Sequence, residues 1–367
     1  MAEITAAMVK DLREKTGAGM MDCKKALNET KGDFAAAEEW LRKKGISKAA
    51  SKGARVAAEG LIAMYTSPDA RTGAMVEVNC ETDFVARNDD FLKLVAQLGE
   101  HVAKANPSYV RAEEVPAGTA ADEKVLLMEQ SLGGKKVKDL VTEATAKIGE
   151  KIDVRRFVRF GVDGDGVVGS YVHGGKIGVL VELSASSDAV AKHPEVLNIA
   201  KELALQVASM RPQYTRREEV PAAAVDKARD DIKFEMENTV QVVIKDGKPV
   251  RGILRTQDAE KLQVEQGGRL EKVPASQVVE IKKITTPPDK VEGALKGKLE
   301  KFYEGVCLVD QVWVKDDKKK MREVVAEAGK KAGGELAVKR FARLEVGEGI
   351  EKKKDDLAAE VAKTLQQ

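Results

Sequence analysis

The sequence has few residues that could support redox or metal chemistry. Its three cysteines, Cys23, Cys80 and Cys307, are widely spaced and odd in number, which excludes a disulfide scaffold and is typical of a reducing, cytoplasmic environment. Its three histidines lack the spacing of a zinc site, and no Cys/His pair has the spacing of a nucleophile and its base. We therefore expect no metal, no cofactor and no enzymatic activity of its own.

Long apolar runs and a strong excess of one charge are also missing. No stretch reaches the ~18 apolar residues of a membrane span, and the N-terminal segment lacks the apolar core of a signal peptide, so we expect a cytoplasmic protein without membrane contact. The formal charge of +2 argues against a DNA-binding chain. The 367 residues, 43% of them hydrophobic but only 4% aromatic, predict two or three domains with aliphatic cores.

Nucleotide-binding motifs are absent or misplaced. The sequence has no GxxxxGK[ST] motif. Residues 164–169 do match GxGxxG, but they lead into a predicted strand, whereas a dinucleotide-binding motif opens a helix. We interpret them as a turn.

Residues 1–54 predict a small three-helix, UBA-like domain followed by a linker. Thr5 is placed to cap the first helix, Gly32-Asp33 to end the second and cap the third, and Gly45 to end the third. Residues 46–58 lack a wide apolar face and are predicted to be a linker. A bundle of this size buries only a small core, so we expect it to leave an apolar patch for a partner.

An internal repeat organises most of the remaining chain. Residues 106–117 (NPSYVRAEEVPA) and 211–222 (RPQYTRREEVPA) share eight of twelve positions, at an offset near 105. Around them, 59–65 aligns with 165–171 and 74–78 with 177–181, which predicts a β-hairpin in each copy. A further match at offset 184, of 154–160 with 338–344, adds a closing strand. The fold class is therefore α+β, with two duplicated subdomains, 55–163 and 164–344, whose helices pack on antiparallel sheets.

The second copy is interrupted at 223–304. One-sided apolar steps in 223–238 and 291–304 predict two helices that pack on each other as an arm. Between them, 239–286 alternates β-branched residues with Gly turns, which predicts a small barrel of four or five strands. Residues 345–367 are predicted to form a C-terminal helical module, with a charged helix at 351–366.

The two copies differ at one loop. Thr82 to Asn88 (TDFVARN) has the same frame as Ser187 to His193 (SDAVAKH), and in each the hydroxyl residue or the Asp is placed to cap the next turn. The exception is Phe84, which aligns with Ala189. Phe84 is therefore either a plug in the other copy's core or an exposed anchor for a partner. His173, in the HGGK turn of the second copy, is either a solvated turn residue or a partner contact.

Several long motifs, in order, resemble bacterial translation elongation factor Ts. They are TGAGMMDCKKAL (16–27), EVNCETDFVARN (77–88), KIGEKIDVRR (147–156), GSYVHGGKIGVLVEL (169–183) and RFARLEVGEGIEK (340–352). The resemblance covers about 1–238 and 288–367. The 239–286 module has no counterpart in the usual family pattern, where a plain helical hairpin stands.

The resemblance implies a guanine-nucleotide exchange factor that releases GDP from elongation factor Tu by disturbing its Mg²⁺ and phosphate site. It assigns this wedge to Thr82, Asp83, Phe84 and Val85. It also implies partner contacts at Met20, Met21, Ile148, Gly149 and His173, although Met20 and Met21 are equally consistent with core methionines. The alternative is an RNA- or ribosome-binding protein acting through 239–286, a module with nine Lys/Arg against six Asp/Glu. This alternative is weaker because the module has no Phe, Tyr or Trp to stack on bases.

Overall fold

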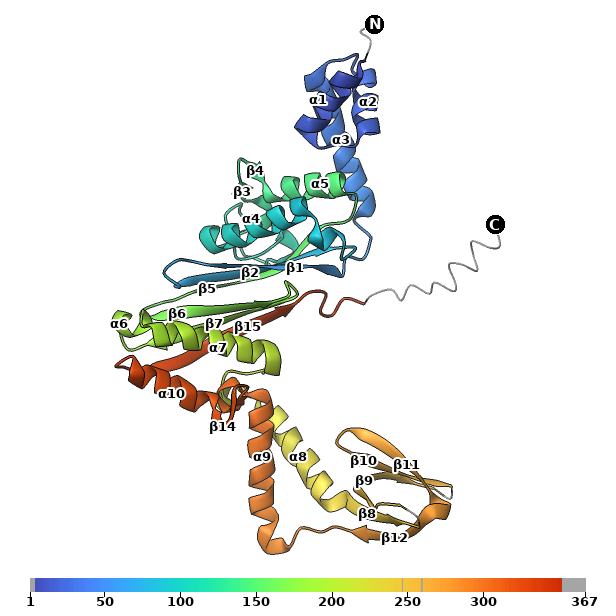
Figure 1. Cartoon of the computed structure of the whole chain (residues 1–367), viewed down its shortest axis with the longest axis vertical. Helices are drawn as coiled ribbons and strands as arrows, with labels where there is room; N and C mark the ends of the chain where they lie inside the picture. The colour runs from blue at the N-terminus through green and yellow to red at the C-terminus, as the bar shows by residue number, and fades with distance from the viewer. Residues whose placement is uncertain (1–3, 246, 259, 352–367) are drawn as a thin grey trace. The chain divides into compact units, whose positions relative to one another are not determined.

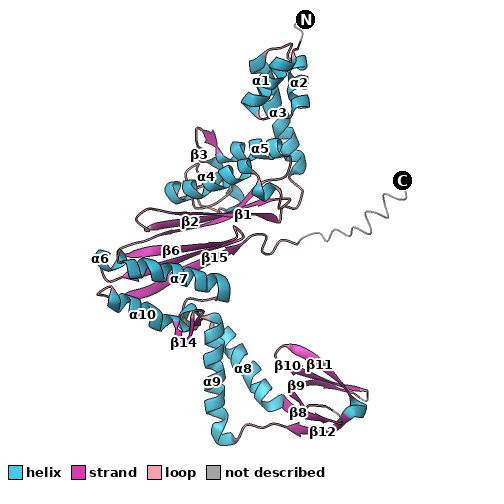
Figure 2. Ribbon diagram, viewed as in Figure 1, coloured by secondary structure: helices cyan, strands magenta, loops and turns pink. Residues whose placement is uncertain are grey.

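The computed structural model describes residues 4–245, 247–258 and 260–351. It is a mixed α+β protein with several antiparallel sheets, coloured by secondary structure in Figure 2. The chain divides into two compact units. One contains the described residues of Met1–Ser209 and Val325–Gln367, and the other is Met210–Val324. The predicted C-terminal helix lies, from residue 352 onward, outside the described residues.

The chain begins with a bundle of three helices, and two predicted caps are confirmed. Thr5 Oγ1 accepts a hydrogen bond from Met8 N at 3.2 Å, and the Asp33 carboxylate accepts one from Ala36 N at 3.0 Å. Gly17, with φ +67°, ends the first helix. The helices are α1 (Ala6–Thr16), α2 (Met20–Glu29) and α3 (Phe34–Lys52). Their small core contains Val9, Leu12, Cys23, Ala26, Leu27 and Ala37.

The predicted end of the third helix at Gly45 is wrong, because α3 continues to Lys52. Gly45 instead permits a close helix crossing: a Cβ placed there would lie 3.1 Å from the Cβ of Ala146 in α5 (Val137–Ile148). The predicted linker at 46–58 is therefore helical over its first seven positions. α3 carries the bundle directly onto the next part of the same unit.

The first copy of the repeat is a three-stranded antiparallel sheet covered by helices. The sheet order is β1-β2-β5, and Figure 1 shows α4 and α5 on one face of it. These elements are β1 (Glu59–Thr66), β2 (Thr72–Cys80), α4 (Asp89–Ala105), the short hairpin β3 (Ser131–Leu132) and β4 (Lys135–Lys136), α5, and β5 (Asp153–Gly161). The core between sheet and helices centres on Phe91, Leu98, Val102, Val76, Val78 and Leu127.

The second copy repeats this plan with the sheet order β15-β7-β6. α7 lies directly against the sheet, since a Cβ on Gly169 would come within 2.2 Å of Ala200 O. Its elements are β6 (Gly166–His173), β7 (Ile177–Ala185), α6 (Asp188–Ala191), α7 (Pro194–Met210), α10 (Met321–Lys331) and β15 (Leu336–Glu345). Each copy therefore has a hairpin closed by a third strand that follows a helix.

The two sheets pack face to face, as Figure 1 shows. Glycines allow the close approach: a Cβ on Gly73 would come within 2.9 Å of Leu180, and one on Gly178 within 2.5 Å of Ile62. The buried side chains between the sheets are Ile62, Met75, Phe160, Val168, Leu180 and Leu344. The two copies therefore share one apolar layer and are held as one body.

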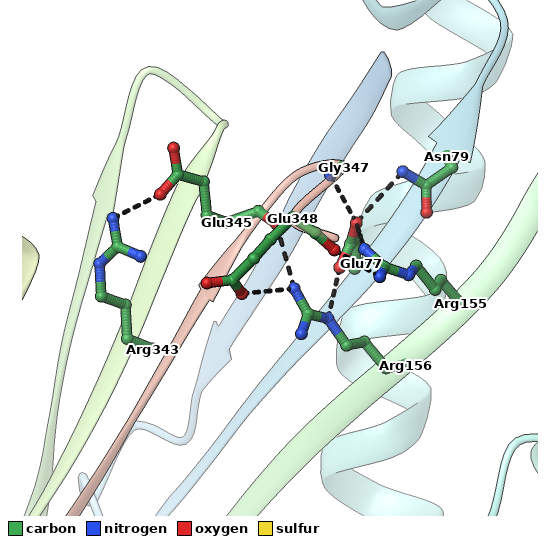
Figure 3. A network of polar contacts seen from close by, with 8 residues as sticks. All are labelled: Glu77, Asn79, Arg155, Arg156, Arg343, Glu345, Gly347 and Glu348. Atoms are coloured by element: carbon green, nitrogen blue, oxygen red, sulfur yellow. Dashed lines mark hydrogen bonds and ion pairs between the residues drawn. The ribbon is translucent and has the colours of Figure 1, made fainter. Parts of the chain in front are cut away.

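A buried carboxylate strengthens this junction (Figure 3). Glu77 of β2 is fully buried and accepts hydrogen bonds from Arg155, from Arg156 and from the backbone N–H of Gly347, which follows β15. Arg156 also binds the Glu348 carboxylate, at 3.1 Å. Burial alone would raise the pKa of Glu77, but these hydrogen bonds outweigh it and hold the pKa below its ordinary value.

The same arrangement recurs in the second copy. Glu182 of β7 is also buried, and Lys339 and Arg340 pair with it at 3.0 and 2.6 Å. Glu77 and Glu182 are 105 residues apart, so the two strands align at that offset. The predicted alignment of 74–78 with 177–181 was shifted by two residues. Such a shift leaves the same side chains facing the core, so hydrophobic alternation cannot detect it.

The other unit contains the two predicted arm helices and the inserted strands. The helices are α8 (Ala222–Asn238) and α9 (Val291–Val306), joined by an ion pair of Lys298 with Glu235 at 2.8 Å. The sheet order is β11-β10-β9-β8-β12. Its strands are β8 (Thr239–Ile244), β9 (Val250–Gln257), β10 (Lys261–Gln266), β11 (Arg269–Pro274) and β12 (Val278–Lys283), and a short pair follows, β13 (Val312–Trp313) with β14 (Asp316–Lys320).

This five-stranded sheet has a core of its own. The core consists of residues from the sheet segment itself, namely Val240, Val242, Val250, Leu262, Val264 and Val273. The number of strands agrees with the predicted four or five. Among the described residues no pairing joins β11 to β12, so closure into a barrel stays a prediction.

Candidate partner-interaction site

The loop that distinguishes the two copies follows β2 and projects Phe84 into solvent. Phe84 is 81% exposed, which excludes the interpretation that it plugs a core. Val85 begins a short 3₁₀ helix, Val85–Arg87, and is half-buried against the core of the first copy. The loop is therefore fixed by its second half, while the phenyl ring contributes almost nothing to folding. A large exposed aromatic on a fixed loop is typical of an interface residue.

The hydroxyl of Thr82, rather than the carboxylate of Asp83, caps this turn. Thr82 Oγ1 accepts from Val85 N at 3.4 Å, whereas Asp83 pairs with Arg87 at 3.2 Å across one helical turn. Both members of that ion pair are exposed, so it contributes little to stability. The Asp83 carboxylate therefore remains at the surface, directly beside Phe84.

The equivalent loop of the second copy has the same frame without the ring. Ser187 Oγ accepts from Val190 N at 3.3 Å, and Asp188 pairs with Lys192 at 2.7 Å. Ala189 stands where Phe84 stands in the first copy. Because the frame forms with alanine, the aromatic ring is not required for the loop to fold.

Two glutamates that the sequence analysis missed hold the Thr82 loop to the segment after α5. Glu150 accepts from Thr82 N at 3.0 Å and from Thr82 Oγ1 at 2.8 Å. Glu81 accepts from the backbone N–H of Lys151 at 2.6 Å and pairs with Arg55 at 3.2 Å. The contacts of Glu150 with Thr82 and of Lys151 with Glu81 join residues 68 and 70 positions apart, so no local motif indicates them.

The predicted contacts Ile148 and Gly149 lie at this same junction. Ile148 is the last residue of α5 and is half-buried against the core of the first copy. Gly149 is exposed and ends the helix with φ +90°, a conformation that favours glycine. Lys52, at the end of α3, donates to the Gly149 carbonyl. The next residue, Glu150, contacts Thr82, so the 148–149 segment lies beside the attachment point of the Thr82 loop.

His173 ends β6 and is exposed at the tip of the second hairpin. Its Nδ1 lies 3.1 Å from the Tyr171 hydroxyl, and Gly174 and Gly175, both with positive φ, form the tight turn that follows. The turn lies against the first copy, since Gly175 O accepts from Ile62 N at 2.8 Å and Lys176 pairs with Glu59 at 2.8 Å. It therefore lies beside the end of the first sheet where the Thr82 loop leaves β2, because Glu59 is opposite Cys80 in the ladder.

Met20 and Met21 open α2 and are 56% and 77% exposed. Neither belongs to the core of the bundle, so the interpretation as core methionines is wrong. The break before them lies close to the end of α5: a Cβ on Gly17 would come within 2.8 Å of Lys147 Cε. The two exposed methionines are apolar surface on the bundle, and an apolar patch for a partner stays a prediction.

The thiol of Cys80 lies beside the Thr82 loop. Burial raises the pKa of the Cys80 thiol to about 12, so the thiol stays protonated and donates to Thr82 O at 3.1 Å. In the described part of the chain, no three His, Cys, Asp or Glu side chains gather as they would around a metal ion. No described helix is both long enough and apolar enough to cross a membrane.

Comparison with known proteins identifies relatives over nearly the whole chain. The sequence model of a family described as Elongation factor TS matches residues 81–348. A protein named Elongation factor Ts from Symbiobacterium thermophilum is 43% identical over 362 residues, 98% of each chain. Proteins of the same name from Clostridium botulinum and Bdellovibrio bacteriovorus are each 39% identical, over 99% and 98% of this chain and 99% and 97% of their own.

Proposed function

The chain belongs to the elongation factor Ts family, and from that premise we propose that it is a guanine-nucleotide exchange factor in translation elongation. Its partner is elongation factor Tu carrying GDP, and the exchange takes place in the cytoplasm. The wedge is the loop Thr82 to Val85, with Phe84 as the apolar tip and Asp83 as the charge beside it. The observation that carries this proposal is the 81% exposure of Phe84 on a loop whose frame does not need the ring.

The mechanism is displacement without covalent chemistry. Asp83 and Phe84 enter the G domain of the partner and disturb the site that holds Mg²⁺ and the GDP phosphates. Met20, Met21, Ile148, Gly149 and His173 supply further contact surface. The Mg²⁺ belongs to the partner, so the factor needs no cofactor, metal or catalytic residue of its own.

Thermodynamic linkage makes the cycle reversible. A factor that weakens nucleotide binding is itself weakened by nucleotide to the same degree. Binding of a new GTP therefore releases the factor. The free energy that expels GDP comes from the contacts of the wedge and its surroundings, and it is returned when the nucleotide rebinds.

The experiment that tests this function is release of a fluorescent GDP analogue from elongation factor Tu. Catalytic amounts of the chain should accelerate release many-fold, with the rate saturating as the chain is titrated. Absence of acceleration by folded protein would refute the proposal. A gel shift of RNA that depends on residues 239–286 would instead support the alternative of an RNA- or ribosome-binding protein.

A further inference from the structure

The internal duplication separates contacts that fold the Thr82 loop from contacts found only in the first copy. Three features are common to both loops: the hydroxyl cap, the ion pair over one turn, and a backbone attachment. In that attachment Lys151 N donates to Glu81 in the first copy, and Glu335 N donates to Ser186 Oγ, at 3.0 Å, in the second. In the second copy these features build the loop together with one further backbone bond, in which Ser186 N donates to Glu335 O at 3.0 Å, and without any side chain in the place of Glu150.

One contact has no counterpart. Glu150, whose carboxylate holds Thr82, is equivalent at offset 184 to Gly334, which has no side chain. The second copy has no room for one: a Cβ on Gly334 would lie 2.3 Å from Ser186 Oγ and 2.6 Å from Val190 Cγ2. The same offset relates Arg156 to Arg340, which bind the two equivalent buried glutamates, so the equivalence rests on structure as well as on sequence.

We propose that Glu150 is a positioning residue for nucleotide exchange, fixing the direction in which Asp83 and Phe84 project. This inference rests on the proposed function and deepens it. Glu150 distinguishes the copy that carries the phenylalanine from the copy that carries alanine. A contact needed only for folding would be expected in both.

The geometry of the contact explains how it positions the loop. One carboxylate oxygen of Glu150 accepts from Thr82 N and the other from Thr82 Oγ1, so the residue immediately before Asp83 is held at two points. The Thr82 hydroxyl donates its one hydrogen bond to Glu150. Its lone pairs therefore remain available to accept from Val85 N, which follows Phe84 in the chain. Hydrogen bonds to a carboxylate are roughly twice as strong as neutral ones. Glu150 therefore adds two fixed points on the residue before Asp83, while the cap to Val85 N holds the other side of the ring.

The test compares Glu150→Ala and Glu150→Gln in the full chain, using release of a fluorescent GDP analogue from elongation factor Tu. We expect Glu150→Ala to lower the maximal release rate about tenfold or more, the effect of losing a hydrogen bond to a charged group. The half-saturating concentration should change less, because the other contact residues are intact. Glu150→Gln keeps one acceptor oxygen and should restore part of the rate. Glu335→Ala, in the segment of the second copy that is equivalent to the one carrying Glu150, is the control and should exchange normally.

A double-mutant cycle with Thr82→Val shows whether Glu150 acts through Thr82. In that background we expect Glu150→Ala to cost much less than it does alone. Additive losses would mean that Glu150 touches the partner directly, and would overturn the inference. A normal maximal release rate in Glu150→Ala would also overturn the inference. So would a loss of rate that a lower Tm explains entirely in both Glu150→Ala and Glu150→Gln. The proposed function fails separately, if wild-type protein does not accelerate release or if Phe84→Ala exchanges normally.

Discussion

Removal of the Phe84 ring should abolish most of the exchange activity while leaving the protein as stable as before. The ring is 81% exposed, so almost none of its apolar surface contributes to folding. The loop frame is also preserved, because Ala189 already occupies the equivalent place in the second copy. Phe84→Ala is therefore expected to shift the Tm by no more than about 1–2 °C, as for other exposed substitutions.

The cost to exchange follows from the area that the ring can bury in a partner. An aromatic side chain that buries about 150 Å², at about 25 cal/mol per Å², contributes about 4 kcal/mol. Alanine retains the Cβ, so we expect a loss of about 3 kcal/mol, within the range of interface hot spots. That free energy corresponds to a decrease of about a hundredfold in the second-order rate constant of GDP release.

Stopped-flow release of a fluorescent GDP analogue from elongation factor Tu measures this rate constant directly. Phe234→Ala, which removes the same ring from an exposed position of α8, is the matched control and should leave the rate unchanged. Exchange within threefold of wild type by folded Phe84→Ala protein would show that the ring is not the wedge. A large drop in Tm would show that the loop frame depends on the ring after all.

Three further outcomes are expected. Asp83→Ala should slow exchange at least tenfold, whereas Asp188→Ala should leave exchange unchanged. Each substitution removes an exposed i,i+4 ion pair and should cost less than about 0.5 kcal/mol of stability, measured by thermal unfolding. Equal losses of exchange would contradict a specific role for Asp83. Replacing both Met20 and Met21 by alanine should weaken the complex with elongation factor Tu by about 1–2 kcal/mol in a titration, with an unchanged Tm because both side chains are exposed. Replacing 239–286 by a short Gly/Ser linker should keep the exchange rate within about twofold of wild type. The segment has its own core, and the linker costs only about 1 kcal/mol of loop-closure entropy. A folded deletion variant without activity would show that the segment takes part in the mechanism.

Features that depend on local sequence could be predicted well. The cap at Thr5, the cap at Asp33 and the hairpins at 59–80 and 166–185 follow from residues within a few positions of one another. The helical cap, the glycine turn and the alternation of apolar residues each have a short-range physical cause. The duplication added long-range information, because each copy supports the interpretation of the other.

Predictions that depended on a distant neighbour were less successful. Gly45 has the composition of a helix end, but its lack of a side chain serves contact with Ala146, about a hundred residues away in the sequence. The Glu150–Thr82 contact likewise joins segments 68 positions apart. The sequence did contain a signal for this contact, because Glu150 aligns with Gly334 at offset 184. This is the same kind of difference between the copies that identified Phe84, which aligns with Ala189.

The candidate site combines features that the two copies do not share. From the first copy come Phe84 and its support by Glu150, which Ala189 and Gly334 replace in the second. From the second copy comes the tight turn after His173, where the first copy has a longer connection between β1 and β2. The His173 turn contacts the edge of the first sheet, through Ile62 N to Gly175 O and through Lys176 to Glu59. Each copy therefore keeps the common frame that folds it. The features that differ, Phe84 with Glu150 in the first copy and the His173 turn in the second, lie at the same end of the paired sheets. Duplication followed by separate change at one shared edge accounts for a symmetric scaffold that presents Phe84 on one loop and Ala189 on the other.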